Sequence, residues 1–173
     1  MEAVPGVGIV EDAVTVAGAP LRLVRPRSAN EVFDLAVERG ASDAPYWADL
    51  WPAARGLAEH LAGRALADVR TIELGCGLGL PALAAARAGA DVLATDIDPD
   101  PLRLVAESAR RNGLALATAA LDLADAAAVA RLAEQRFELV LAADVLYARD
   151  LGPLVTAAIV RLLATGGEAV VAY

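Results

Sequence analysis

The chain has 173 residues, is 57% hydrophobic and carries a formal net charge of −8, so it can form one domain with a substantial core but not two. The negative charge argues against a general nucleic-acid-binding surface and favours a cationic partner, and no apolar run approaches the roughly 18 residues of a membrane span. A single cysteine, Cys76, excludes a disulfide framework and a cysteine-rich zinc site, and we expect no metal. We predict one cytoplasmic domain, with an N-terminal extension (1–44), a core (45–173), and no nucleic-acid or membrane partner.

A hairpin and a helix are predicted in the N-terminal extension. Residues 13–24 read AVTVAGAPLRLV, in which β-branched and apolar residues alternate on both sides of an AGAP turn, and this pattern predicts a β-hairpin. Residues 25–40 contain a candidate helix cap at Ser28 or Asn30, apolar residues at helical spacing, and a stop at Gly40.

An aromatic segment follows the extension. The sequence APYWADLWPA holds both tryptophans and one of the three tyrosines, although aromatic residues make up only 4% of the chain. Pro52 suits the first turn of a helix that closes at Gly63. Tyr46 and Trp47 are candidate surface anchors for a partner. His60, the only histidine, falls on this helix, where a solvent-facing or packing role is favoured over catalysis.

Residues 69–81 read VRTIELGCGLGLP, which is an apolar run followed by glycine at every second position and then by a proline. The run predicts a buried strand. Glycine has no Cβ, so the backbone can take positive φ and a ligand can approach the peptide groups closely. Pro81 predicts the start of a helix, and the free N–H groups at such a start favour a polar, nucleotide-like ligand.

Strands and helices alternate through the rest of the chain. Helices are predicted at 81–88, 99–112, 124–135 and after a cap at Asp150, and strands at 91–96, 114–121, 137–144 and 167–173. This alternation predicts the α/β class, with a doubly wound, mainly parallel, Rossmann-like sheet.

The glycine spacing argues against a dinucleotide ligand. The fingerprint G-x-G-x-x-G would need a third glycine at position 80, where this chain has Leu80. Asp96 lies about 20 residues beyond the loop at the predicted carboxyl end of a strand, where a carboxylate can accept hydrogen bonds from both ribose hydroxyls. An ordinary helix cap is the alternative role for Asp96, although Asp98 is better placed as the cap.

The motif ELGCGLG, followed by an acid at the end of the next strand, resembles the class I, seven-strand, S-adenosylmethionine-dependent methyltransferases over about residues 45–173. The resemblance implies S-adenosylmethionine as cofactor. The binding set that it implies is Glu73, Gly75, Cys76, Gly77, Gly79, Asp96, Ile97, Asp122 and Leu123. In this family Glu73 would help to hold the loop and the cofactor's amino group, and Asp122 would contact the adenine amino group. A contact to the loop alone for Glu73, and a helix cap for Asp122, are the alternatives; Cys76 is favoured as a small loop residue over a nucleophile.

Two further motifs, PYWADLWPA and DVLY, resemble methyltransferase family 16, which contains many protein-lysine methyltransferases, and in particular its electron-transfer-flavoprotein β-subunit lysine methyltransferase branch. The resemblance places Trp51 beside the cofactor, and Asp144 and Tyr147 where the acceptor amine meets the methyl group. Core filling is the alternative for Trp51, and a packed helix start for Tyr147. A lysine amine, with a reference pKa of about 10.4, must lose a proton before it attacks. Asp144 would orient the ammonium, and Tyr147 would shape the channel.

We therefore predict methyl transfer to a protein lysine, with a small-molecule amine as the nearest alternative and a catalytically impaired cofactor-binding module as a third. A nicotinamide dehydrogenase is a distant fourth because of Leu80. Members of the resembled family usually continue past the fifth strand with a helix and an antiparallel strand pair, so we expect either a fragment or a fold without these strands. Residues 167–173 would then be an apolar edge strand, which invites pairing with another chain, so we expect homodimerisation or poor solubility.

Overall fold

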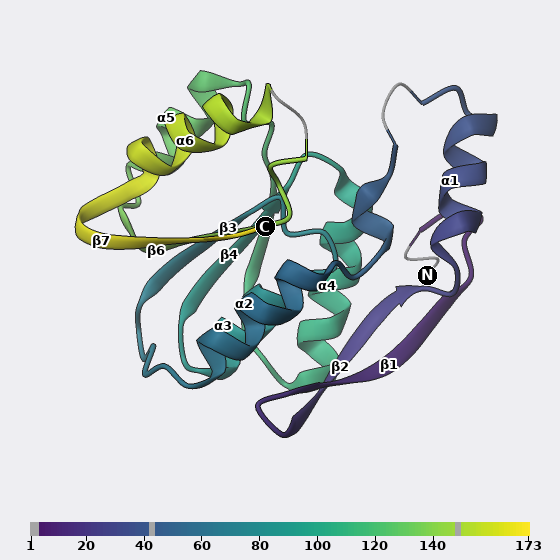
Figure 1. Ribbon diagram of the computed structural model, residues 1–173, viewed down its shortest axis with the longest axis horizontal. Helices are drawn as coiled ribbons and strands as arrows, with labels where there is room; N and C mark the ends of the chain where they lie inside the picture. Colours follow the sequence, from purple (N-terminus) through teal and green to yellow (C-terminus); the bar gives the residue numbers. More distant parts are fainter. Residues whose placement is uncertain (1–3, 42–43, 148–149) are drawn as a thin grey trace.

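The computed structural model describes residues 4–41, 44–147 and 150–173 (Figure 1). The elements in chain order are β1 (Ile9–Val16), β2 (Ala19–Pro26), α1 (Ala29–Glu38), the 3₁₀ helix η1 (Tyr46–Ala48), α2 (Pro52–Ala62), β3 (Arg70–Leu74), α3 (Leu80–Arg87), β4 (Asp91–Asp96), α4 (Pro99–Asn112), β5 (Ala117–Ala120), α5 (Ala126–Ala133), β6 (Phe137–Ala143), α6 (Leu151–Leu162) and β7 (Leu163–Ala172).

The main sheet has five parallel strands in the order β5-β4-β3-β6-β7. Helices α2, α3 and α4 cover one face and α5 and α6 cover the other, as Figure 1 shows. The predicted α/β, doubly wound fold is therefore confirmed. From β3 the chain proceeds outward to β4 and β5, whereas β6 and β7 lie on the other side. This reversal places a topological switch point between the carboxyl ends of β3 and β6, where open α/β sheets bind their ligands.

Alternating side chains of the central strand β3 contribute to both layers of the core. Ile72 and Leu74 belong to a cluster under α5 and α6, which also contains Val140 and Val155. Glu73 and Thr71 point to the opposite face, because successive strand side chains alternate. Glu73 is the only charged side chain among the buried residues of β3, and it is 1% exposed, whereas Arg70 at the start of the strand is exposed. The strand thus buries an acid against the face that α3 covers.

The predicted N-terminal hairpin is present and is longer than residues 13–24. Strands β1 and β2 pair antiparallel from Ile9↔Pro26 to Val16↔Ala19. Pairing extends past the apolar alternation because backbone hydrogen bonds do not depend on side-chain polarity. The hairpin lies against α4, where the backbone N–H of Val24 donates to Oγ of Ser108 over 2.9 Å. Its buried side chains join the core cluster that contains Leu104 of α4.

Several predicted boundaries differ from the observed ones. Of the two candidate caps of α1, Ser28 is the N-cap, and its Oγ accepts a hydrogen bond from the N–H of Glu31. Helix α5 starts later than predicted because Asp125 accepts hydrogen bonds from its first N–H groups. Asp150 stands at the N-cap of α6, but its side chain makes no capping hydrogen bond.

Three other elements differ in extent. Helix α3 begins at Leu80 after the left-handed Gly79, one residue before Pro81. Strand β5 is limited to the four residues that pair with β4. Strand β7 follows α6 directly at Leu163, four residues before the predicted start.

Strand β7 is the outer strand of the sheet and pairs with β6. Its exposed apolar side chains include Val171 at 36%, and Tyr173 beyond its end is 93% exposed. The expectation of an edge strand is confirmed, and pairing of β7 with a second copy remains a prediction. Within the described ranges, no helix has the length and hydropathy needed to cross a membrane.

We expect Gly79→Ala to destabilise the protein more than Gly113→Ala, although both glycines have left-handed φ, +69° and +66°. A Cβ on Gly79 would lie 2.5 Å from Cγ2 of Val105, whereas one on Gly113 would meet nothing within 4 Å. The matched substitution at Gly113 should cost about 1 kcal/mol of backbone strain, and the one at Gly79 about 3 kcal/mol. Urea unfolding of both variants measures the difference, and equal losses would contradict the close packing of the loop on α4.

Candidate functional site

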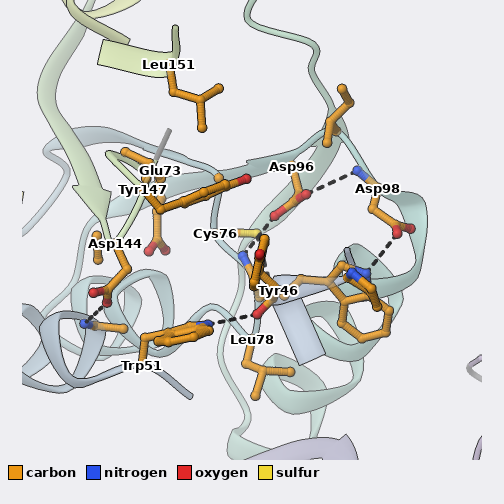
Figure 2. A pocket seen from close by; sticks show the side chains of 18 of the residues that line it. Tyr46, Trp51, Glu73, Cys76, Leu78, Asp96, Asp98, Asp144, Tyr147 and Leu151 are labelled. Atoms are coloured by element: carbon orange, nitrogen blue, oxygen red, sulfur yellow. Dashed lines mark hydrogen bonds between the residues drawn. The ribbon is translucent and has the colours of Figure 1, made fainter. Parts of the chain in front are cut away.

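A cavity of about 460 Å³ lies at the switch point, over the carboxyl ends of β3, β4 and β6 (Figure 2). Its size is typical of small-molecule and cofactor sites. Every residue that the sequence assigned to the site lines this one cavity: Trp51, Glu73, Gly75, Cys76, Gly77, Gly79, Asp96, Ile97, Asp122, Leu123, Asp144 and Tyr147. The structure therefore brings the whole predicted set together, while the role of each residue remains a prediction.

The glycine loop is shaped by left-handed backbone and by hydrogen bonds to its neighbours. Gly75 has φ +61°, and a Cβ there would lie 2.8 Å from Cγ1 of Val145. The backbone N–H of Cys76 donates to the carbonyl oxygen of Thr95 over 2.8 Å, which ties the loop to β4. Only glycine suits this conformation and this close approach, so the loop can bring backbone groups to the floor of the cavity.

Asp96, the last residue of β4, holds the loop from the other side. Its Oδ2 accepts from Gly77 N–H over 2.9 Å, and its Oδ1 accepts from Asp98 N–H over 3.1 Å. The cap of α4 is Asp98, whose Oδ1 accepts from Asp100 N–H. Asp96 is 7% exposed, and burial raises its pKa although these N–H groups oppose the shift. Asp98, and not Asp96, is thus the cap of α4, as expected.

Glu73 is the most deeply buried acid of the cavity. Its Oε2 accepts from Ala82 N–H over 2.8 Å, in the first turn of α3, where orphan N–H groups and the helix dipole favour a carboxylate. Burial nevertheless raises the pKa of Glu73 to about 8, with the charge of Asp96 adding to the shift. The predicted contact with the loop and its helix is therefore present, and a contact with a cofactor remains a prediction.

Asp144 follows β6 on the opposite side of the cavity and is held by two distant parts of the chain. Its φ is +55°, a left-handed value that is uncommon outside glycine and best tolerated by Asp and Asn. Its Oδ2 accepts from Ala54 N–H over 3.1 Å at the start of α2, and its N–H donates to Ala172 O at the end of β7. These bonds fix the carboxylate at the cavity wall.

Aromatic rings gather at the mouth of the cavity beside Asp144. The ring of Tyr46 lies 5.1 Å from that of Tyr147, 6.2 Å from that of Trp51 and 6.0 Å from that of Phe33, between centroids. The indole N–H of Trp51 donates to Tyr46 O over 2.8 Å. Figure 2 shows Trp51, Asp144 and Tyr147 on the same side of the cavity. Core filling does not describe Trp51, which is 41% exposed.

The sequence did not identify the role of Trp47. It was a candidate surface anchor, but it is only half-exposed, and its Nε1 donates to Oδ2 of Asp98 over 2.8 Å. The indole N–H is therefore already bonded inside the fold, and the surface-anchor role of Trp47 remains a prediction. No sequence pattern marks this pair, whose members are 51 residues apart.

The remaining candidates occupy simpler positions. Asp122 is exposed and its Oδ1 accepts from Ala124 N–H, while the cap of α5 is Asp125. Ile97 is 67% exposed and Leu123 half-exposed at the cavity, where they offer apolar surface. Burial raises the pKa of the Cys76 thiol well above its usual value, so it stays protonated and is a poor nucleophile, as expected. His60 is exposed on α2, away from the lining.

All the charged residues among the described lining of the cavity are acids. They are Asp49, Glu73, Asp96, Asp98, Asp122 and Asp144. No arginine or histidine occurs in that described lining, and the chain has no lysine. A cavity of this kind favours cationic ligands and opposes pyrophosphate or other phosphate groups.

Fold and site together define an α/β protein with a cofactor-sized, acidic cavity at its switch point. The family named Methyltransferase domain matches residues 72–171, which is more than half of the chain. This chain belongs to that family, the class I methyltransferases whose methyl donor is S-adenosylmethionine. The predicted family is therefore confirmed.

Individual relatives are similar over shorter stretches. The electron transfer flavoprotein beta subunit lysine methyltransferase of Xenopus laevis is 39% identical over 82 residues, which cover 46% of this chain and 32% of the relative. The ribosomal protein L11 methyltransferase of Alteromonas mediterranea is 46% identical over 55 residues, covering 31% of this chain and 19% of the relative. The match thus spans less than a third of either relative's length.

A solved structure supports the fold. The 16S rRNA N2 G1207 methyltransferase of T. Thermophilus, in complex with AdoMet and guanosine, superposes with a TM-score of 0.64 at 19% identity, over 91% of this chain and 40% of that one.

We expect the stability of the cofactor-free protein to fall as pH rises from about 5 to 8, because of Glu73. The unfolded chain releases this proton near the ordinary glutamate value of 4.5, whereas burial raises the pKa in the folded chain to about 8. Between these two pKa values the folded chain holds a proton that the unfolded chain has released. The free energy of unfolding therefore falls as the pH rises through this window. Over this range the free energy of unfolding of the wild type should fall by on the order of 3 kcal/mol relative to that of Glu73→Gln.

Urea unfolding of both proteins at several pH values measures this difference. The glutamine oxygen can still accept from Ala82 N–H, and Asp96 is present in both proteins, so its own titration largely cancels. Parallel stability curves for the two proteins would show that Glu73 is ionised throughout.

Proposed function

We propose that this protein transfers a methyl group from S-adenosylmethionine to an amine, and that the amine is a lysine side chain of a protein. The observation that carries the proposal is the acidic cavity: its described lining has five aspartates and the buried carboxyl group of Glu73, and no basic side chain. Both the sulfonium donor, with its net positive charge, and an ammonium acceptor suit this field, whereas a dinucleotide or a nucleic-acid phosphate does not.

The residues of the β3 and β4 ends fit the cofactor. Asp96 has one bond on each carboxylate oxygen, which leaves acceptor capacity for two ribose hydroxyls. Ile97 and Leu123 supply apolar surface for a flat adenine ring, with Asp122 beside them to accept from its amino group. Glu73 makes one hydrogen bond among the described residues, to Ala82, and can accept from the cofactor's ammonium. When bound, S-adenosylmethionine supplies a methyl group activated by a positively charged sulfur.

The residues around β6 and α2 fit the acceptor. Asp144 presents a carboxylate that α2 and β7 hold in place, so it can bind and orient an ammonium group at the cavity wall. The faces of Tyr46, Trp51 and Tyr147 attract a cation and exclude water from its alkyl stem. In-line transfer requires close alignment, and groups held in place in this way support it. The proton of the ammonium leaves to water before attack.

The protein-lysine acceptor is supported by the similarity to two families of enzymes whose names specify protein substrates, one of them a lysine methyltransferase. An exposed mouth, rather than a closed chamber, also suits an acceptor that is a side chain of a larger molecule: Tyr147 is 66% exposed and Tyr46 43%.

Isothermal titration calorimetry tests the cofactor. We expect S-adenosylmethionine to bind the wild-type protein with a Kd in the micromolar range, and NAD to show no binding at millimolar concentration. The reason is that the aspartates of the cavity attract a sulfonium and repel a pyrophosphate, so raising the salt concentration should weaken the binding of S-adenosylmethionine. Binding of NAD without binding of S-adenosylmethionine would contradict the proposal.

Tritiated S-adenosylmethionine, incubated with the protein and a lysate from its own source, tests the acceptor. We expect a labelled protein band, and we expect Asp144→Asn to reduce its rate of labelling by about 30-fold or more because the charge that orients the ammonium is lost. Asparagine can keep the hydrogen bond from Ala54 and tolerates the left-handed φ, so the Kd for the cofactor should change less than about threefold. Asp144→Ala should abolish labelling with similar retention of cofactor binding.

The matched control is Asp91→Asn, which neutralises an exposed acid at the opposite end of β4 and should leave labelling unchanged. Label confined to small molecules would favour the amine alternative. An equal loss of cofactor affinity in the Asp144 variants would show that Asp144 belongs to the cofactor site instead.

A further inference from the structure

The indole of Trp47 is joined to Asp96 through Asp98. Nε1 of Trp47 donates to Oδ2 of Asp98 over 2.8 Å, and the backbone N–H of Asp98 donates to Oδ1 of Asp96 over 3.1 Å. The other carboxylate oxygen of Asp98 accepts from Asp100 N–H over 2.9 Å, so this side chain spans the indole and the first turn of α4. One of the two bonds that hold Asp96 therefore depends on a residue that Trp47 fixes.

Trp47 also lies against the group that makes the second bond. A Cβ placed on Gly77 would be 3.6 Å from Cα and 3.7 Å from the carbonyl oxygen of Trp47, so the backbone of η1 rests on the glycine loop at this point. The N–H of Gly77 donates to Oδ2 of Asp96 over 2.9 Å. A single residue thus contacts both partners of the Asp96 carboxylate.

We propose that Trp47 is a positioning residue of the cofactor site, which orients Asp96 toward the ribose hydroxyls through Asp98 and Gly77. This inference rests on the proposed function. The terminal torsion of an aspartate is broad, so the plane of its carboxylate must be fixed by partners. Two backbone N–H groups fix it here, and the lone pairs that they leave are then directed into the cavity. An indole suits the task because its one N–H can only donate and its large ring keeps η1 in place.

The Trp47→Phe variant tests the proposal, because it keeps an aromatic ring at position 47 and the backbone contact with Gly77 but removes the N–H donor. Calorimetry on wild type and variant measures the Kd of two ligands, S-adenosylmethionine and its 2′,3′-dideoxy analogue. We expect the variant to bind S-adenosylmethionine about tenfold more weakly and the dideoxy analogue less than about twofold more weakly. The penalty is specific because the orientation of Asp96 affects only ligands that have ribose hydroxyls.

Trp51→Phe is the matched control. It removes the other indole hydrogen bond of the same segment, from Trp51 to Tyr46 O, which does not lead to Asp96. Any loss of affinity in this variant should be equal for the two ligands. Asp98→Ser gives an independent route if Trp47→Phe folds poorly, since serine can cap α4 but is too short to reach the indole. It should reproduce the ribose-specific penalty.

The outcomes separate this proposal from the function on which it rests. Equal penalties for both ligands in Trp47→Phe and Asp98→Ser, or no penalty, would overturn the positioning role and leave the proposed function intact. Wild-type protein that binds both ligands equally well would show that Asp96 does not hold the ribose, and the positioning role would fall with it. Wild-type protein that binds neither ligand would overturn both.

Discussion

The carboxylate of Asp96 accepts hydrogen bonds from two backbone N–H groups, and much of the structure depends on this arrangement. Gly77 belongs to the loop after β3, and Asp98 belongs to the start of α4. The glycines of the loop have no side chains with which to fix their left-handed backbone, so external hydrogen bonds must do so. By joining β4 to the loop, Asp96 fixes the floor of the cavity and the point from which α3 begins.

Three of the helices that begin at this cavity, α2, α3 and α4, each donate a hydrogen bond to one of its acidic side chains. Asp144 accepts from the first turn of α2, Glu73 from that of α3 and Asp98 from that of α4. The free N–H groups and the positive end of each helix dipole offset part of the repulsion among the acids. At Glu73 the hydrogen bond from Ala82 does not offset the cost of burying the charge, so burial raises the pKa of this carboxyl to about 8. The cavity therefore remains an environment that a cation stabilises, which is the physical basis for the amine and sulfonium ligands proposed above.

The N-terminal elements support the aromatic side of the cavity. Strand β2 packs on α4, and the helix that follows places Phe33 against Tyr46. Tyr46 in turn accepts at its carbonyl oxygen from the indole of Trp51. The segment 46–51 thus contacts the glycine loop through Trp47 and the mouth of the cavity through Tyr46 and Trp51. This segment connects the cofactor side of the cavity with the acceptor side.

Features that depend on neighbouring residues were predictable from the sequence: the glycine loop after β3, the cap of α4 at Asp98, and the alternation of strands and helices that makes the sheet parallel. These features follow from local rules, since backbone conformation, capping and side-chain period are all set within a few residues. Contacts between side chains that are far apart in the sequence became visible only in the folded chain. Asp144 meets Ala54 at a separation of 90 residues and Trp47 meets Asp98 at 51, and the extent of β5 follows from its pairing with β4. No local rule predicts such contacts, because they depend on how the helices pack around the sheet.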